Sequence, residues 1–352
     1  MINAKRVLMP SQYVGYSQDK YCGYLEDFNI ASRVAETNLH RNLDTAVKPA
    51  DIVYVHTAHP SIVMGIAAWY TALPPEKRPY LCLKFQNHCY RYVATEFKAL
   101  VLSVFRLALK PFQTMEKVRL AASNKLIRQQ IEAVAEKPCR VFPIPLQLET
   151  PPKTFRRSID KKTLYIGYAG EGRIEQGVLF LPEVIEAIIS RHANVKFVVQ
   201  IACQFATDAT LARLRSFGDR VILHEQCITG SDFHKLINSF DALLLPYRPD
   251  KYIERSSQIV IEGIVLGVPL IVPGRTSLAH EAKNFDCGHV LIQGWDPQAI
   301  LAAIEDFIRF HDDLAFKSSQ AAQRCADFHC GRSLVDILLE TGTANRCPDQ
   351  SA

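Results

Sequence analysis

The stretch DALLLPYRPDKYIERSSQIVIEGIVLGVPLIVP, residues 241–273, contains a complete strand–helix–strand unit. Two short apolar runs, 242–245 and 270–272, predict strands. Between them Ser257 predicts the start of a helix, because serine is a good N-cap residue, and the Gly-Val-Pro at 267–269 predicts its end. Two apolar strands joined by a helix form a parallel βαβ unit, so this stretch favours an α/β fold.

The same alternation of apolar runs and amphipathic segments continues in both directions. The apolar runs predict strands at 6–9, 52–56, 80–85, 120–122, 140–144, 164–168, 196–201, 221–223, 242–245, 270–272 and 290–291. The amphipathic segments predict helices at 61–72, 96–110, 178–191, 209–217, 232–238, 257–266 and 297–311.

One proline-rich segment interrupts this alternation. It is PIPLQLETPPKTFRRSIDKK at 143–162, whose four prolines exclude a helix interior or a central strand. We therefore predict two Rossmann-like, doubly wound α/β lobes. The expected organisation is an N-terminal lobe at 1–145, a linker at 146–162, a C-terminal lobe at 163–342 whose last helix is free to pack back on the first lobe, and a tail at 343–352.

The composition is that of a globular protein with a small excess of positive charge. The chain has 352 residues, 48% of them hydrophobic and 22% charged, which is enough for two domains with their own cores. A net charge of +5 suits an anionic ligand or an anionic membrane surface and is too small to indicate nucleic-acid binding. The ten cysteines lack zinc-site spacing, which favours reduced thiols in a cytosolic protein. We expect neither a signal peptide nor a membrane-spanning helix.

Several residues around the predicted helix at 257–266 are suited to an anionic ligand. The free N–H groups of its first turn and the positive end of its dipole attract anions, and Arg255 adds a planar cation for phosphate oxygens. Glu254 lies in the loop before the helix, and Glu262 lies on its second turn. Because open α/β sheets bind ligands beyond the carboxyl ends of their strands, we expect this loop to border a ligand crevice. A capped core helix with two solvated acids is the alternative.

The spacing Glu254-x7-Glu262, followed by GIVLGVPLIVP, resembles the C-terminal signature of family-4 retaining glycosyltransferases. That family has the GT-B architecture, in which two Rossmann-like lobes face a cleft. The resemblance implies that Glu254 binds hydroxyls of a donor sugar and that Glu262 binds ribose hydroxyls. Arg255, Ser256 and Ser257 stand where the family more often has an apolar-Gly pair whose amides meet the diphosphate. The serines keep those amides and add hydroxyls.

The stretch LYIGYAGEGRIEQG resembles the first loop of the family's C-terminal domain. Gly170 and Gly172 let the backbone approach a ligand closely. The family clamps the diphosphate with an arginine and, a few residues later, a lysine. Arg173 matches the arginine, but Gln176 stands where the lysine is expected. One cation of the clamp is therefore missing, and Arg255 is the candidate that could replace it.

In the first lobe, the resemblance implies that a histidine at a strand end faces the donor sugar. His56 ends the strand of DIVYVHTAHP, and His88 follows the strand of YLCLKFQNHCYRY. We expect His88 first, and His56 second, to be catalytic together with Arg173 and Glu254. A structural role is the alternative for any single histidine at a strand end.

The activity implied by the resemblance is transfer of a sugar from a nucleotide sugar to a glycan, a lipid-linked molecule or a small molecule, with retention of the anomeric configuration. No cofactor and no metal are expected, and the donor is expected to be UDP- or GDP-linked. The sequence does not distinguish the two bases. The alternatives are a GT-B sugar-nucleotide epimerase and a non-catalytic protein that binds nucleotide sugars.

A basic segment of the first lobe bears on localisation. FKALVLSVFRLALKPFQTMEKVR, residues 97–119, combines an apolar helix face with five cations. A basic amphipathic helix can lie on anionic lipid, which would suit a lipid-linked acceptor. The favoured alternative is a surface helix packed on its own sheet. We expect a cytoplasmic protein and leave open a peripheral contact with the inner face of a membrane.

Overall fold

The computed structural model describes 47–58, 60–86, 98–146, 163–201 and 207–340, with residue 153 and several positions between 33 and 43. The predicted strand at 6–9, the predicted tail and most of the predicted linker lie outside the described residues.

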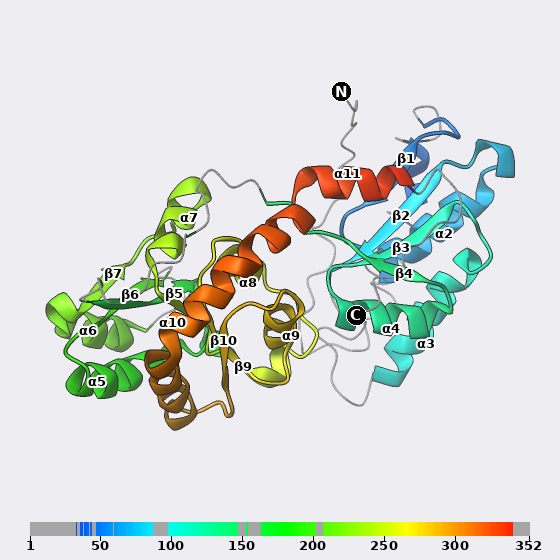
Figure 1. Ribbon diagram of the computed structural model, residues 1–352. Helices are drawn as coiled ribbons and strands as arrows, with labels where there is room; N and C mark the ends of the chain where they lie inside the picture. Colours follow the sequence, from blue (N-terminus) through cyan, green and yellow to red (C-terminus); the bar gives the residue numbers. More distant parts are fainter. Residues whose placement is uncertain are drawn as a thin grey trace. The chain divides into compact units, whose positions relative to one another are not determined.

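The chain divides into two compact units (Figure 1). Unit 1 comprises Met1–Phe142 and Leu334–Ala352, and unit 2 comprises Pro143–Ser333. Unit 2 is thus continuous in the sequence, whereas unit 1 is formed by two separate segments.

In the described residues, unit 1 is built on a sheet of four parallel strands in the order β1-β2-β3-β4. Trp69, Phe85 and Phe105 are buried in the main core of this unit. The elements of unit 1 are β1 (Ile52–Val55), α2 (Pro60–Ala72), β2 (Tyr80–Phe85), α3 (Lys98–Leu109), β3 (Val118–Ala122), α4 (Lys125–Ala135) and β4 (Cys139–Val141).

A small second core of unit 1 involves the end of the chain. Cys82, Ala121 and Phe142 are buried there, and apolar side chains of α11 (Gly331–Leu339) pack against them, namely Leu334, Ile337 and Leu338. The last described helix therefore covers apolar residues of the sheet that the first part of the chain forms.

Unit 2 contains a sheet of six parallel strands in the order β10-β9-β8-β5-β6-β7. Its strands are β5 (Leu164–Gly170), β6 (Val195–Ile201), β7 (Val221–His224), β8 (Ala242–Leu244), β9 (Leu270–Pro273) and β10 (His289–Ile292). Its helices are α5 (Leu181–Arg191), α6 (Asp208–Ser216), α7 (Gly230–Ser239), α8 (Gln258–Val265), α9 (Ser277–Asn284) and α10 (Pro297–Phe328).

Helices cover both faces of this sheet, so its strands are apolar on both sides. In β6, Phe197 and Val199 belong to a core shared with α5, whereas Val198 belongs to a core shared with α8. This alternation follows from the two-residue period of a strand. Burial on both faces is the reason that these strands appear in the sequence as continuous apolar runs.

Helix α10 is 32 residues long and is interrupted at Phe310, whose φ and ψ of −113° and 15° are not helical. Its first half packs in the core with α5, and its second half packs in the core with α8. The prediction ended this helix at His311, next to the interruption, and missed the second half. The short helices α9 and α11 were also missed.

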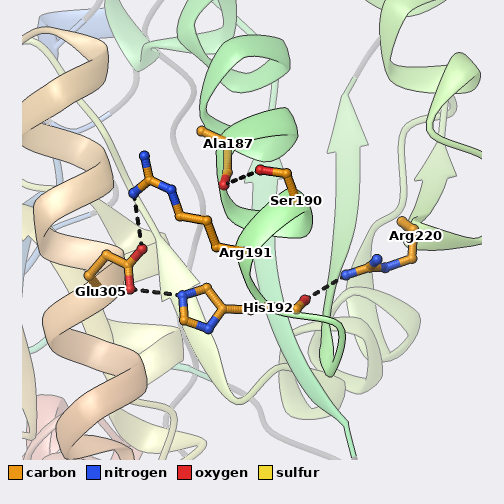
Figure 2. Close-up of polar contacts among 6 residues, drawn as sticks. All are labelled: Ala187, Ser190, Arg191, His192, Arg220 and Glu305. Carbon is orange, nitrogen blue, oxygen red and sulfur yellow. Dashed lines mark hydrogen bonds and ion pairs between the residues drawn. The ribbon is translucent and has the colours of Figure 1, made fainter.

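An ion cluster joins the end of α5 to α10 (Figure 2). One carboxylate oxygen of Glu305 lies 3.3 Å from Arg191 NH1, and the other lies 2.8 Å from His192 Nε2. Arg220 donates to the carbonyl of His192 at 2.7 Å. Because a crossover helix returns to the amino edge of a parallel sheet, these contacts lie at the edge opposite to that where ligands bind.

Within the described parts of the chain, no helix is both long enough and apolar enough to span a lipid bilayer.

Candidate functional site

The loops that follow β5 and β8 meet at the carboxyl edge of the sheet in unit 2. Strands β6 and β7 lie on one side of β5, and β8, β9 and β10 lie on the other. Open α/β sheets bind ligands where the strand order reverses in this way. The backbone N–H of Arg248, after β8, donates to the carbonyl of Glu175, after β5, at 2.8 Å. The two loops predicted separately from the sequence are therefore in contact at this edge.

Gly177 makes this close approach possible. Its φ is 78°, and a Cβ atom here would lie 2.4 Å from the carbonyl oxygen of Pro246. Gly172 has a φ of 74°, and its Cβ would lie 2.4 Å from Cγ2 of Ile201. At Gly170, by contrast, the nearest atom would be 3.6 Å away. Contacts within the chain thus leave no space for a side chain at Gly177 and Gly172. At Gly170 the space beside the backbone is not filled by other residues.

Arg173 lies in the loop after β5 and is half-buried. Its guanidinium group forms an ion pair with Glu171, and its Nη1 lies 3.9 Å from Oε1 of Glu175. Ion pairs at this exposure contribute little stability and exchange readily with other partners. An anionic ligand can therefore replace these two carboxylates as the partner of Arg173.

Gln176 holds the loop together instead of supplying a charge. Its Oε1 accepts a hydrogen bond from the backbone N–H of Arg173 at 3.1 Å, and its Nε2 donates to Oη of Tyr247 at 3.4 Å. Where the family resemblance implies a lysine, this chain thus has a neutral side chain that links the loop to the residues after β8.

Arg255 is held above an aromatic ring. Its guanidinium carbon lies 4.8 Å from the ring centroid of Tyr252, which is a cation–π distance, and the Tyr252 ring packs 4.6 Å from that of Tyr247. The carbonyl of Arg255 also accepts a hydrogen bond from Oγ of Ser277. The backbone and the side chain of this second cation are therefore both fixed by neighbouring residues.

The start of α8 has no side-chain cap. Ser257 is the N-cap residue but makes no capping hydrogen bond with its side chain. Ser256 and Ser257 are both half-buried just before the helix. The N–H of Val260 donates to the carbonyl of Ser257 at 3.2 Å, so no side chain is used to cap this turn, and the helix dipole makes an anion favourable there.

Three tyrosines close to these groups are buried and uncharged. Burial raises the pKa of Tyr168, Tyr247 and Tyr252, so each phenol is neutral at physiological pH. The charge of Arg255 opposes this rise in the pKa of Tyr252, the carboxylate of Glu175 adds to it, and the charge of Arg173 opposes it more weakly. Within the described residues, Oη of Tyr168 is buried without a hydrogen-bond partner.

The two glutamates differ in environment. Glu254 is half-buried in the loop before α8. Glu262 is 5% exposed on the second turn of α8, and its Oε1 accepts from Nε2 of Gln258 at 2.9 Å. The same oxygen lies 3.6 Å from Nε2 of His234 on α7. The prediction placed Glu262 correctly on the helix but gave no sign of its buried partners.

In unit 1, His56 lies directly after β1 and is exposed. Nε2 of Gln86, directly after β2, lies 3.1 Å from either ring nitrogen of His56. Partial burial, followed by the charge of Lys84, lowers the pKa of His56, and burial lowers that of Lys84 to about 8. The imidazole is therefore neutral at pH 7. His88 lies outside the described residues.

Sequence reasoning missed three residues of the site, Tyr247, Tyr252 and His234. The two tyrosines stand in the quoted stretch after the β8 strand, so their position at a strand end was a usable signal. His234 carried none, because its partner is distant in the sequence. In the described residues, no group of three or more His, Cys, Asp or Glu side chains could hold a metal ion.

Comparison with known families adds nothing at the level of sequence. No model of a known protein family matches the chain, and no curated protein matches it by sequence.

Solved structures, in contrast, match most of the chain. Sucrose-phosphate synthase from Thermosynechococcus elongatus is 14% identical, with 91% of this chain and 78% of that chain covered and a TM-score of 0.60. HepE of Anabaena in complex with UDP-glucose is 14% identical, with 92% and 83% covered and a TM-score of 0.59. A UDP-forming α,α-trehalose-phosphate synthase from Burkholderia xenovorans is 11% identical, with 90% and 79% covered and a TM-score of 0.62.

These similarities define the class of fold. The chain has the GT-B fold, and the predicted architecture of two Rossmann-like lobes is confirmed.

Proposed function

We propose that this protein is a glycosyltransferase that moves a sugar from a nucleotide sugar to an acceptor with retention of the anomeric configuration. The observation that carries the proposal is the joined pair of loops in unit 2. They bring Arg173, Arg255 and the uncapped start of α8 to the switch point of the sheet. Three sources of positive charge at one edge suit a diphosphate. A neighbour of the same fold holds UDP-glucose, which supports a nucleotide sugar as the ligand.

In the proposed reaction, the bond between the anomeric carbon and the diphosphate oxygen breaks, and its electron pair leaves with the diphosphate. An acceptor oxygen bonds to the anomeric carbon and gives up its proton, which the departing phosphate oxygen takes. Arg173, Arg255 and the start of α8 would stabilise the charge that develops on the diphosphate. Glu254 would bind hydroxyls of the donor sugar, and Glu262 would bind the ribose.

The remaining features of the proposal concern metal and histidines. We propose that no metal is required, since the groups named above supply the positive charge, and turnover should then be the same with and without EDTA. His56 is neutral and exposed at a strand end, which suits a catalytic role in this reaction. His88 stays a prediction for the same role.

Ligand binding tests the proposal directly. The melting temperature should be measured with UDP, UDP-glucose, GDP and GDP-mannose, because a ligand at 100 times its Kd stabilises the native state by about 2.7 kcal/mol. We expect a rise of several degrees with one of the two nucleotide families. No shift with any of the four would contradict the proposal.

A second assay separates transfer from its alternatives. The donor that stabilises the protein is incubated with and without a panel of sugar, sugar-phosphate and lipid-linked acceptors, and products are separated by chromatography. We expect a product that depends on the acceptor. Conversion of the donor alone to an epimer would indicate the epimerase, and binding without turnover would indicate a non-catalytic protein.

We also propose that α3 makes a peripheral contact with anionic lipid, consistent with a lipid-linked acceptor. Leu100 and Leu107 on α3 are 44% and 61% exposed, and Arg106 and Lys110 are exposed beside them. Arg106 and Lys110 also line a hollow of about 370 Å³ together with residues that include Ser103 and Gln113. Exposed leucines between cations are what an amphipathic helix presents to anionic lipid.

Sedimentation with vesicles checks this contact. The protein should sediment with phosphatidylglycerol vesicles at low salt and much less with phosphatidylcholine vesicles. Leu107→Glu should reduce sedimentation several-fold, because it adds a negative charge to the contact face. Leu339→Glu is the matched control, since Leu339 is a leucine of α11 with 54% exposure, and it should have no effect. Absence of sedimentation, or equal loss in both variants, would rule out the contact.

A further inference from the structure

His234 and Glu262 form a buried pair between two helices that pack against each other. His234 lies on α7 and is 8% exposed, and Glu262 lies on α8 and is 5% exposed. A carboxylate is rarely buried without partners, because removal from water is costly. Glu262 has two such partners, Gln258 and His234.

The two carboxylate oxygens of Glu262 have different surroundings. Oε1 accepts from Nε2 of Gln258 at 2.9 Å and lies 3.6 Å from Nε2 of His234. Within the described residues, Oε2 has no hydrogen bond or ion pair, and this oxygen is not fully buried. One oxygen is thus held by the protein, while the other keeps contact with solvent and can accept from a ligand.

The surroundings of His234 decide which ring nitrogen carries the proton. Nδ1 is buried and has no hydrogen-bond partner among the described residues. A proton on Nδ1 would bury an unsatisfied N–H group and turn the lone pair of Nε2 toward a carboxylate. A proton on Nε2 avoids both and turns an N–H group toward Oε1 of Glu262, 3.6 Å away. We assign the Nε2–H tautomer on this ground.

We propose that His234 is a positioning residue that, together with Gln258, fixes the Glu262 carboxylate so that its free oxygen accepts from the ribose 2′-hydroxyl of the nucleotide. This inference rests on the proposed function, in which Glu262 binds the ribose. A carboxylate that is held in place and poorly solvated discriminates between ligands, because a ligand without the hydroxyl leaves the oxygen without a partner. The pair would therefore make the protein selective for ribonucleotides over 2′-deoxyribonucleotides.

The test compares nucleotides that differ only at the 2′ position. The Kd values of UDP and 2′-deoxy-UDP, and of GDP and 2′-deoxy-GDP, are measured by titration calorimetry with the wild type, His234→Leu and His234→Asn. We expect the wild type to prefer the ribonucleotide by about tenfold, which corresponds to about 1.4 kcal/mol. His234→Leu should bring this ratio close to one by weakening ribonucleotide binding, with 2′-deoxynucleotide binding unchanged.

A second variant and a control separate positioning from folding. Asparagine keeps an N–H donor, so His234→Asn should recover part of the preference. Gln258→Leu removes the other donor to Oε1 and should also lower the ratio. A wild type without preference, a ratio unchanged in His234→Leu, or equal weakening of both nucleotides would overturn the inference. A wild type that binds none of the four nucleotides would overturn the proposed function itself.

Discussion

Arg173→Ala should lower kcat/KM for the nucleotide sugar by at least about a hundredfold, the effect typical of removing one group that stabilises charge in a transition state. Arg173 lies in the loop after β5, where its side chain forms ion pairs with Glu171 and Glu175. Pairs of this exposure contribute at most about 1 kcal/mol, so the melting temperature should change by no more than a few degrees. Steady-state kinetics and thermal unfolding measure the two effects.

Arg191→Ala is the matched control for this substitution. Arg191 is another arginine of unit 2 that forms an ion pair, with Glu305, but it lies in the cluster at the end of α5 (Figure 2). We expect its kcat/KM to stay within about twofold of the wild type. Unchanged activity in Arg173→Ala, or equal loss in the two variants, would remove Arg173 from the proposed mechanism.

Gly177→Ala should lower the free energy of unfolding of unit 2 by about 2–4 kcal/mol, since it combines a strained backbone with a clash. The residue has a φ of 78°, and the new Cβ would lie 2.4 Å from a backbone carbonyl oxygen, which cannot rotate away. A fall in melting temperature on the order of 5–15 °C is expected by calorimetry. The same variant should weaken nucleotide binding, because it separates the two loops of the site.

Gly218→Ala separates the two causes of this loss. Gly218 also has a positive φ, of 56°, but a Cβ there would have no atom within 4 Å. Only backbone strain remains, and we expect a cost of about 1–2 kcal/mol with normal nucleotide binding. Equal stability of the two variants would contradict the close contact between Gly177 and Pro246 that joins the two loops.

The fold could be predicted largely because a parallel sheet covered on both faces has apolar strands separated by helices. Each βαβ unit is local in the sequence, so its pattern is visible without tertiary information. The second half of α10 gave no such signal, since its buried face consists of small or weakly apolar side chains, namely Ser318, Ala321, Ala322 and Cys325. Hydrophobic periodicity is weakest for such residues.

The candidate site could be predicted only where it is local. The sequence predicted that Arg173 lies in the loop after a strand and that Arg255 and Glu262 lie around the start of one helix, and the structure has them there. The sequence could not indicate that Gln176 reaches Tyr247, or that His234 faces Glu262, because those contacts join separate elements. The substitution of Gln176 for a lysine therefore looked like a missing charge, whereas the structure gives this side chain a role in joining the two loops.

The order in which the two units are encoded has a consequence for synthesis of the protein. A ribosome completes unit 2 at Ser333 before it reaches Leu334, Ile337 and Leu338, the residues of α11 that pack against Cys82, Ala121 and Phe142 of unit 1. Until then, the sheet made first has these apolar residues uncovered. Because nascent chains expose such surfaces to aggregation, we expect the N-terminal unit to stay incomplete and dependent on chaperones through most of translation, while unit 2 can fold as soon as it emerges.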